Sequence, residues 1–338
     1  MAFLRKFTTI INKSDKEIYK IDSEDGINLS SYDINFNIIY SKKIIKGDYS
    51  FVDYWFDITS SNKLYGIINN KIDSLIYFHI TDKIMIKNIF IKYNSKSTYI
   101  KFLYIKELKK STHIIYYELD KLNPYNVKLM HYYKDDNTWR KYLIDSFSYK
   151  ILTNFVITYD NTISPSIFYY KLDNGFEELF VSTFNIQLCK WSEPIKITNS
   201  KKDKIYLSVI KDSLNNYHIL YSENNFGKYY CNYISGYIKN NKFITKYNLI
   251  LSDSVACNFP NIIEYNNKIY AAWIEYNNLY ITESKTFGFI WQKSSLVENC
   301  STSPFVCCNY HSNKYTDNKF NYFTLFMIDN SLEILGIK

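Results

Sequence analysis

The feature that most constrains the fold is a recurring unit of three short strands joined by polar turns. Within each strand, apolar and polar residues alternate, as in Ile205-Tyr206-Leu207-Ser208-Val209, a pattern typical of half-buried β-strands. The residues that close the first strand of successive units are separated by 35, 50, 53, 52 and 53 positions: Asp22, Asp57, Glu107, Asp160, Asp212 and Tyr265. A repeat of roughly 40 to 50 residues with four strands each indicates a β-propeller.

The unit occurs seven times. Its predicted strands are 18–22, 27–32 and 36–42; 52–57, 63–68 and 75–80; 100–107, 113–118 and 127–132; 155–160, 166–171 and 177–182; 205–212, 217–222 and 228–233; 261–265, 268–274 and 279–282; 305–310, 320–328 and 332–337. A fourth, outer strand is predicted over 85–93, 139–144, 191–198, 243–251 and 291–297. No ten-residue segment with helical spacing and caps interrupts them, so the chain is predicted to be all-β.

The two ends of the chain predict how the propeller closes. An additional strand, 3–10, precedes the first unit, and the last unit has no outer strand of its own. We therefore expect the N-terminal strand to complete the last blade, which would protect two open sheet edges. The prediction is a single domain, 1–338, forming a seven-bladed propeller, with six blades as the alternative if the first and last units share one.

Turn chemistry and composition exclude several other classes of protein. With only 8 glycines and 5 prolines, the chain has no glycine-rich phosphate loop, and asparagine is expected to take the left-handed turn positions. No apolar stretch approaches the ~20 residues of a membrane-spanning helix. The first residues lack the features of a secretory signal, so we expect synthesis in the cytoplasm and a final location there or on a spore surface.

The basic residues argue against nucleic-acid binding. All but two of the 41 lysines and arginines are lysines, and they are spread along the chain, which has a net charge of +8. Bidentate recognition of phosphates and guanine favours arginine. No nucleic-acid partner is predicted.

One segment resembles a known repeat motif. Ser284-Lys-Thr-Phe-Gly288-Phe-Ile-Trp291 resembles the Asp-box, SxDxGxxW, of sialidase-type propellers, with Thr286 in place of the aspartate. Weaker versions occur at 136–139, 185–191 and 224–227. The resemblance implies a structural turn between third and fourth strands, remote from the catalytic face, with Trp291 packed in a blade.

The resemblance does not extend to sialidase activity. Sialidases hold the substrate carboxylate with three arginines, whereas this chain has only Arg5 and Arg140. Other propeller glycosidases use paired carboxylates. Candidates for such pairs are Asp48, Asp53, Asp57, Glu177, Glu178, Glu264, Glu275 and Glu283, each better explained as a turn-forming or solvated residue. A carboxylate-dependent glycoside hydrolase is the alternative function, and no catalytic residue is assigned.

Isolated histidines and the absence of ligand motifs predict neither a metal site nor a cofactor. His113 and His218 alternate with apolar residues in second strands and are expected to be core histidines. The predicted binding surface is instead the set of polar loops leading into the inner strands. The residues assigned to it are Asp145, Lys201, Asp253, Asn258, Asn299 and Ser301. We expect a non-enzymatic binding or scaffold protein that recognises a carbohydrate or a protein.

Cysteines and tyrosines allow a second use of the same scaffold. Four of the six cysteines lie near the C-terminus and are candidates for cross-links: Cys257, Cys300, Cys307 and Cys308. The chain also has 35 tyrosines, which would make an adhesive surface where exposed. Self-assembly into a spore or cell-surface layer is therefore a hypothesis, with reduced, buried thiols as the other interpretation.

Overall fold

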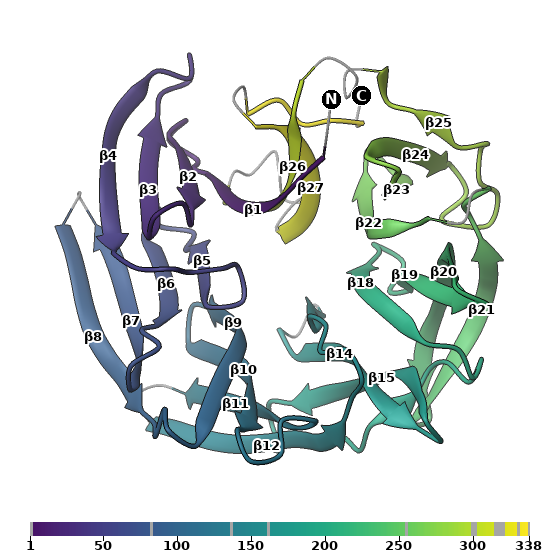
Figure 1. Cartoon of the computed structure of the whole chain (residues 1–338), viewed down its shortest axis with the longest axis horizontal. Coiled ribbons are helices and arrows are strands. Elements are labelled where there is room, and N and C mark those ends of the chain that lie inside the picture. The colour runs from purple at the N-terminus through teal and green to yellow at the C-terminus, as the bar shows by residue number, and fades with distance from the viewer. Residues whose placement is uncertain are drawn as a thin grey trace. The chain divides into compact units, whose positions relative to one another are not determined.

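A computed structural model of the chain describes residues 3–81, 84–135, 138–160, 163–253, 256–298, 303–313, 322–329 and 332–336. In these ranges the regular structure is β-strand, arranged in six antiparallel sheets (Figure 1). The described residues contain no helix that could cross a membrane. The chain divides into two compact units. The N-terminal unit comprises Lys6–Phe147 and Cys307–Phe323, and the C-terminal unit comprises Met1–Arg5, Ser148–Val306 and Thr324–Lys338.

One sheet joins the first and last copies of the repeat. Its strand order is β27-β26-β1-β2-β3-β4. These strands are β1 (Phe3–Asn12), β2 (Ile18–Asp22), β3 (Ile27–Tyr32), β4 (Ile38–Ile45), β26 (Phe305–Ser312) and β27 (Tyr322–Ile328). Strands of the first and last units thus lie in one sheet, as the six-blade alternative expects. The number of blades stays a prediction.

The N-terminal strand pairs with the last copy, but not where the sequence suggested. We expected it beside a strand over 332–337, whereas β1 lies between β26 and β2, and 332–336 contributes only an isolated bridge from Ile334 to Met327. The reason is local. A tight turn, in which Lys13 N–H bonds to the Glu17 carbonyl at 2.9 Å, folds β1 directly onto β2. Closing so short a loop costs less entropy than a distant pairing.

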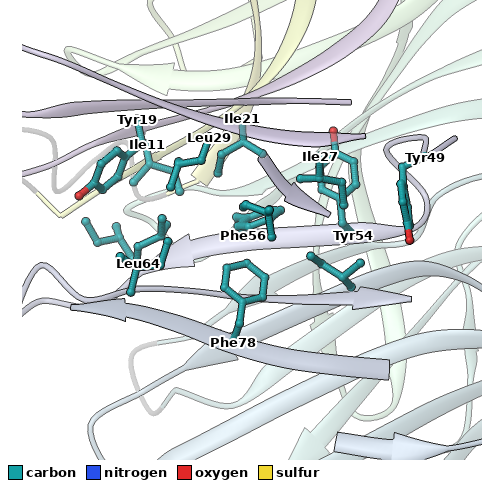
Figure 2. Close-up of a cluster of buried hydrophobic side chains, with 14 residues drawn as sticks. Ile11, Tyr19, Ile21, Ile27, Leu29, Tyr49, Tyr54, Phe56, Leu64 and Phe78 are labelled. Carbon is teal, nitrogen blue, oxygen red and sulfur yellow. The ribbon is translucent and has the colours of Figure 1, made fainter. Parts of the chain in front are cut away.

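Two four-stranded sheets complete the N-terminal unit. One has the order β5-β6-β7-β8 and the other β12-β11-β10-β9. Their strands are β5 (Tyr54–Ile58), β6 (Leu64–Asn69), β7 (Ser74–Thr81), β8 (Ile84–Lys92), β9 (Thr98–Glu107), β10 (Ser111–Asp120), β11 (Asn126–Asp135) and β12 (Thr138–Ser148). Ile21 and Leu29 of the six-stranded sheet pack in one cluster with Phe56 and Phe78 of the β5–β8 sheet, and all four side chains are fully buried (Figure 2).

The C-terminal unit contains the other three sheets. They are formed by β13 (Val156–Tyr159), β14 (Pro165–Asp173), β15 (Phe176–Asn185), β16 (Lys190–Trp191) and β17 (Ile195–Lys196); by β18 (Lys204–Lys211), β19 (Tyr217–Asn225), β20 (Lys228–Lys239) and β21 (Lys242–Ile250); and by β22 (Asn258–Tyr265), β23 (Lys268–Glu275), β24 (Asn278–Ser284) and β25 (Ser295–Leu296). Phe168 and Val181 of the first sheet pack on Val209 and Ile219 of the second, which gives this unit its own core.

Outer strands are shorter than predicted where the sequence breaks their pairing. The expected strand 191–198 is split into β16 and β17 around Pro194, which has no N–H to donate to the ladder. The expected strand 291–297 is reduced to β25. Asparagine does occupy the left-handed turn positions, with φ of 64° at Asn62, 65° at Asn215 and 67° at Asn277.

Candidate functional site

Aromatic residues recur where the inner strands begin. Phe51, Phe102, Phe155, Tyr206 and Phe259 are separated by 51, 53, 51 and 53 positions. Phe51 and Phe155 precede β5 and β13, Tyr206 and Phe259 lie within the first three residues of β18 and β22, and Phe102 is the fifth residue of β9. The repeat therefore delivers one aromatic side chain to the same structural position in successive sheets. The alternation of strand residues does not reveal this set, although its spacing is visible in the sequence.

Three of these aromatics occupy an unfavourable backbone conformation. The φ angles are 55° at Phe102, 54° at Tyr206 and 48° at Phe259. In each case the register of the inner strand against its neighbour shifts at that position, which marks a β-bulge. Bulky residues avoid this region, and such strain persists mainly where the surrounding structure holds a side chain in place. The bulge re-aims each ring away from the regular alternation of its strand.

The rings form short rows within each unit. In the C-terminal unit the centroids of Tyr206 and Phe259 are 4.5 Å apart, and both rings are half-buried. In the N-terminal unit Phe7 and Phe51 are 4.2 Å apart, Phe51 and Phe102 are 6.0 Å apart, and Phe51 is 38% exposed. Each row thus presents part of its aromatic surface to solvent. We call Tyr206, Phe259 and the adjoining residues 199–204, 253 and 256–258 the strand-start face of the C-terminal unit.

A buried ionic cluster holds one loop of this face. The Lys204 ammonium group is fully buried and lies 2.9 Å from Glu178 Oε2 and 3.5 Å from Glu223 Oε2. It also donates to Ser200 Oγ at 2.8 Å and to the Lys202 carbonyl at 2.7 Å. Burial alone would raise the pKa of Glu178, but hydrogen bonds from Thr198 and Lys204 outweigh it and lower that pKa. The carboxylate therefore stays ionised and anchors the loop before β18.

The neighbouring glutamate anchors the preceding loop. Glu177 Oε1 accepts hydrogen bonds from the backbone N–H groups of Lys150 and Ile151, each at 2.9 Å. Glu177 is fully buried, and its burial raises its pKa despite these two donors. Glu177 and Glu178 were predicted as a candidate catalytic pair. Because successive residues of a strand point to opposite faces, each instead serves a different loop.

The N-terminal unit uses buried aspartates in the same way. Asp53 is fully buried, 2.9 Å from both Lys71 and Lys101, and accepts the Ser50 N–H at 3.0 Å. Its burial would raise its pKa, but these partners lower it. Asp57 contacts Lys106 at 2.8 Å, Tyr65 Oη at 3.0 Å and His311 at 3.1 Å. Despite complete burial, Lys106 and His311 hold the pKa of Asp57 below its usual value.

Most of the remaining carboxylate candidates also have identified partners. Glu264 accepts a hydrogen bond from Ser213 Oγ at 3.2 Å, Glu275 from Trp273 Nε1 at 2.6 Å, and Glu283 from Lys268 at 2.9 Å. Asp48 is exposed. The described residues contain no group of three or more histidine, cysteine, aspartate or glutamate side chains that could hold a metal ion.

The two core histidines predicted from the sequence are buried, and each has a partner that the sequence did not reveal. His113 Nδ1 lies 3.1 Å from His131 Nε2, with the rings parallel. Burial lowers the pKa of His113 to about 3, and burial with the charge of His113 lowers that of His131 well below its usual value. His218 bridges Asp212, at 2.9 Å, and the Tyr233 hydroxyl, at 2.7 Å.

The structure places four of the six predicted binding residues. In the C-terminal unit, exposed Lys201 donates its backbone N–H to Glu178 at 2.8 Å, Asp253 is exposed, and Asn258 directly precedes Phe259. Asp145 belongs to the N-terminal unit, where it accepts the Ser146 N–H at 2.8 Å near the end of β12. Asn299 and Ser301 lie outside the described residues. Lys201, Asp253 and Asn258 all lie in loops or first strand residues of the strand-start face.

The candidate cross-linking cysteines are mostly inside the protein. Cys257 is completely buried, and Cys307 and Cys308 are each 1% exposed. Cys300 lies outside the described residues. Burial withholds these three thiols from a second molecule in the native state, so cross-linking through them would need local opening.

Comparisons with known proteins define the fold. No protein-family model matches the chain, and no curated protein does. Among solved structures, an ulvan lyase of polysaccharide lyase family PL25, bound to a GlcA-Rha3S saccharide, aligns with a TM-score of 0.62 at 10% identity, covering 99% of this chain and 93% of its own. The α-L-arabinofuranosidase of Fusarium graminearum with arabinobiose aligns with a TM-score of 0.54 at 11% identity, covering 83% and 94%.

An α-L-arabinanase of Penicillium chrysogenum aligns with a TM-score of 0.51 at 12% identity, covering 83% of this chain and 94% of its own. These structures are β-propellers, and their likeness confirms the predicted all-β propeller fold. At this level of identity the likeness does not extend to a shared activity.

Proposed function

We propose that this protein is a non-enzymatic β-propeller, a single domain over 1–338, that binds a carbohydrate through the strand-start face. The observation that carries the proposal is the strained, half-exposed aromatic pair Tyr206 and Phe259. Aromatic faces bind the C–H groups of sugar rings, and polar side chains beside them supply direction. We assign this role to Lys201, Asp253 and Asn258, and Asp145, Asn299 and Ser301 stay predicted binding residues.

One further observation supports binding without hydrolysis, and a second favours a saccharide as the ligand. Glu177, Glu178, Asp53 and Asp57 are buried and engaged in holding loops or neighbouring strands, which leaves them unsuited to reach a glycosidic bond. The similar structures named above include an ulvan lyase and an α-L-arabinofuranosidase, each with a bound saccharide, which favours a saccharide over a protein as the ligand of this protein. We also propose that the Asp-box-like segment 284–291 is a structural turn. If the protein belongs to a spore or cell-surface layer, the proposed carbohydrate binding would take place in that layer.

The test is titration of the purified protein with a panel of soluble polysaccharides by isothermal calorimetry. Removing either ring, as in Tyr206→Ala or Phe259→Ala, should weaken binding about fivefold, whereas Tyr206→Phe should keep it, because a stacking contact contributes roughly 1 kcal/mol. Phe289→Ala is the matched control, since Phe289 is an exposed aromatic of the same unit outside this face.

Equal binding by the Tyr206→Ala and control variants would refute the assigned face. Release of reducing ends from a bound polysaccharide would instead establish the alternative, a glycoside hydrolase. In that case replacing the responsible carboxylate by its amide should abolish turnover while leaving binding in place.

A further inference from the structure

A pocket lies at the opposite end of the β18–β21 sheet from the strand-start face. It has a volume of about 390 Å³ and is lined by Lys211, Leu214, Asn215, Asn216, Tyr217, Tyr237, Ile238 and Lys246. Lys211 ends β18, whereas Tyr206 lies near its start. Five residues of a strand span roughly 17 Å, so the pocket is separate from the face already described.

The lining of this pocket contains two cations and no acidic residue. Lys246 Nζ donates to Asn216 Oδ1 at 2.6 Å and lies 5.4 Å from the centroid of the Tyr237 ring. Lys211 Nζ lies 5.3 Å from the centroid of the Tyr217 ring. Within the described ranges, neither ammonium group has a carboxylate within ion-pair distance. Other lysines of this unit do pair, for example Lys268 with Glu283 at 2.9 Å.

The acidic groups near the pocket are already committed elsewhere. Asp212 and Asp160 act on Lys211 electrostatically, but burial has the larger effect and lowers the pKa of Lys211. Asp212 accepts hydrogen bonds from the Asn216 N–H at 2.7 Å and from His218 at 2.9 Å. Asp160 accepts the Ser164 N–H at 2.9 Å. The charge of the two lysines is therefore left without a direct counterion.

We propose that this pocket binds an anionic saccharide unit, with Lys211 and Lys246 contacting its carboxylate or sulfate ester. The two ammonium groups supply charge-assisted hydrogen bonds to the oxyanion. Asn215 and the half-buried ring of Tyr237 supply amide and aromatic contacts for the sugar body, and the volume falls within the range of small-ligand pockets. This site is independent of the proposed function, because it uses other residues at the other end of the sheet.

The experiment uses the full chain labelled with ¹⁵N and follows amide shifts during titration with glucuronate, with glucose as the neutral comparison. Glucuronate should shift the amides of Asn215 and Asn216 saturably, and glucose should not. Lys211→Gln and Lys246→Gln should each weaken glucuronate binding about tenfold, as expected for a lost charge-assisted contact. Added salt should also weaken it.

Matched controls separate this result from non-specific attraction. Lys228→Gln removes the same charge from an exposed position at the other end of the sheet and should leave the affinity unchanged. Inorganic sulfate and a sulfated monosaccharide are titrated in the same way. Tighter binding of glucuronate or of the sulfated monosaccharide than of inorganic sulfate supports the proposal. Saturation by sulfate alone, equal shifts with glucose, or equal loss in Lys228→Gln would overturn it. Unfolding midpoints of all variants verify that they are folded.

Discussion

Replacing Gly288 by alanine tests how the turn over 284–291 is seated on the neighbouring sheet. Gly288 has φ of +85°, and a Cβ there would lie 1.8 Å from the Tyr233 hydroxyl oxygen and 3.3 Å from His218 Nδ1. Tyr233 is buried, shares a hydrogen bond with His218 at 2.7 Å, and packs edge-on against Trp291 at 4.9 Å. The tyrosine must therefore move, and its buried hydrogen bond must break.

The expected cost combines two contributions. A side chain in the left-handed region costs about 1 kcal/mol, and displacing a buried hydrogen-bonded tyrosine costs about 2 to 3 kcal/mol more. We therefore expect Gly288→Ala to lower the free energy of unfolding by about 3 to 4 kcal/mol in chemical denaturation.

Two other glycines separate the contributions. Gly227 and Gly175 have φ of 80° and 82°, and no atom lies within 4 Å of the place that a Cβ would take, so alanine there should cost only the backbone part, about 1 kcal/mol. Adding Tyr233→Phe to Gly288→Ala removes the closest atom, and the double variant should be less destabilised than the sum of the single ones. A Gly288→Ala protein as stable as Gly227→Ala would show that Tyr233 does not obstruct a side chain at position 288.

Three further predictions concern buried polar groups. The folded-state pKa values of His113 and His131 lie below 6.5, so the unfolded state binds protons first as the pH falls. The free energy of unfolding should therefore be complete above pH 6.5 and fall by about 1.4 kcal/mol per pH unit for each histidine toward pH 3. Denaturation of the H113N/H131N variant should show a shallower dependence of this free energy on pH, and an unchanged dependence would contradict the assignment. Lys204→Met should lower the free energy of unfolding by about 3 to 5 kcal/mol, because it leaves the buried Glu178 carboxylate without its cationic partner. Lys202→Met, at the surface, should change it by no more than about 1 kcal/mol. Half-buried Cys189 should react with a thiol reagent before buried Cys257, Cys307 and Cys308 in the native protein, and reducible oligomers formed without unfolding would instead support the surface-layer hypothesis.

Strand positions were predictable because alternation and turn residues are local signals. The bounds of β2 and β3 agree with the prediction at both ends, and asparagine marks the turns as expected. The position of β1 was not predictable in this way, because its pairing depends on a competition between a nearby hairpin and a distant edge. The predicted strand 332–337 is present in its described part, 332–336, only as the bridge from Ile334 to Met327 of β27.

The candidate site was predictable in location more than in chemistry. Loops before the inner strands follow from topology, and Lys201, Asp253 and Asn258 lie there. The orientations of Tyr206 and Phe259 depend on β-bulges, which interrupt the two-residue alternation and so are not predicted from it. Glu177 and Glu178 looked like a catalytic pair because their opposite orientations and loop partners become visible only in three dimensions.

Saturation-transfer NMR on a bound oligosaccharide tests directly whether Tyr206 and Phe259 form a saccharide-binding surface. A saccharide selected by calorimetry should receive saturation mainly at the C–H protons of one sugar face, and this transfer should be lost in Tyr206→Ala and Phe259→Ala but kept in Phe289→Ala. Transfer that is unchanged in the first two variants would show that the saccharide binds elsewhere and that the two rings do not form its binding surface.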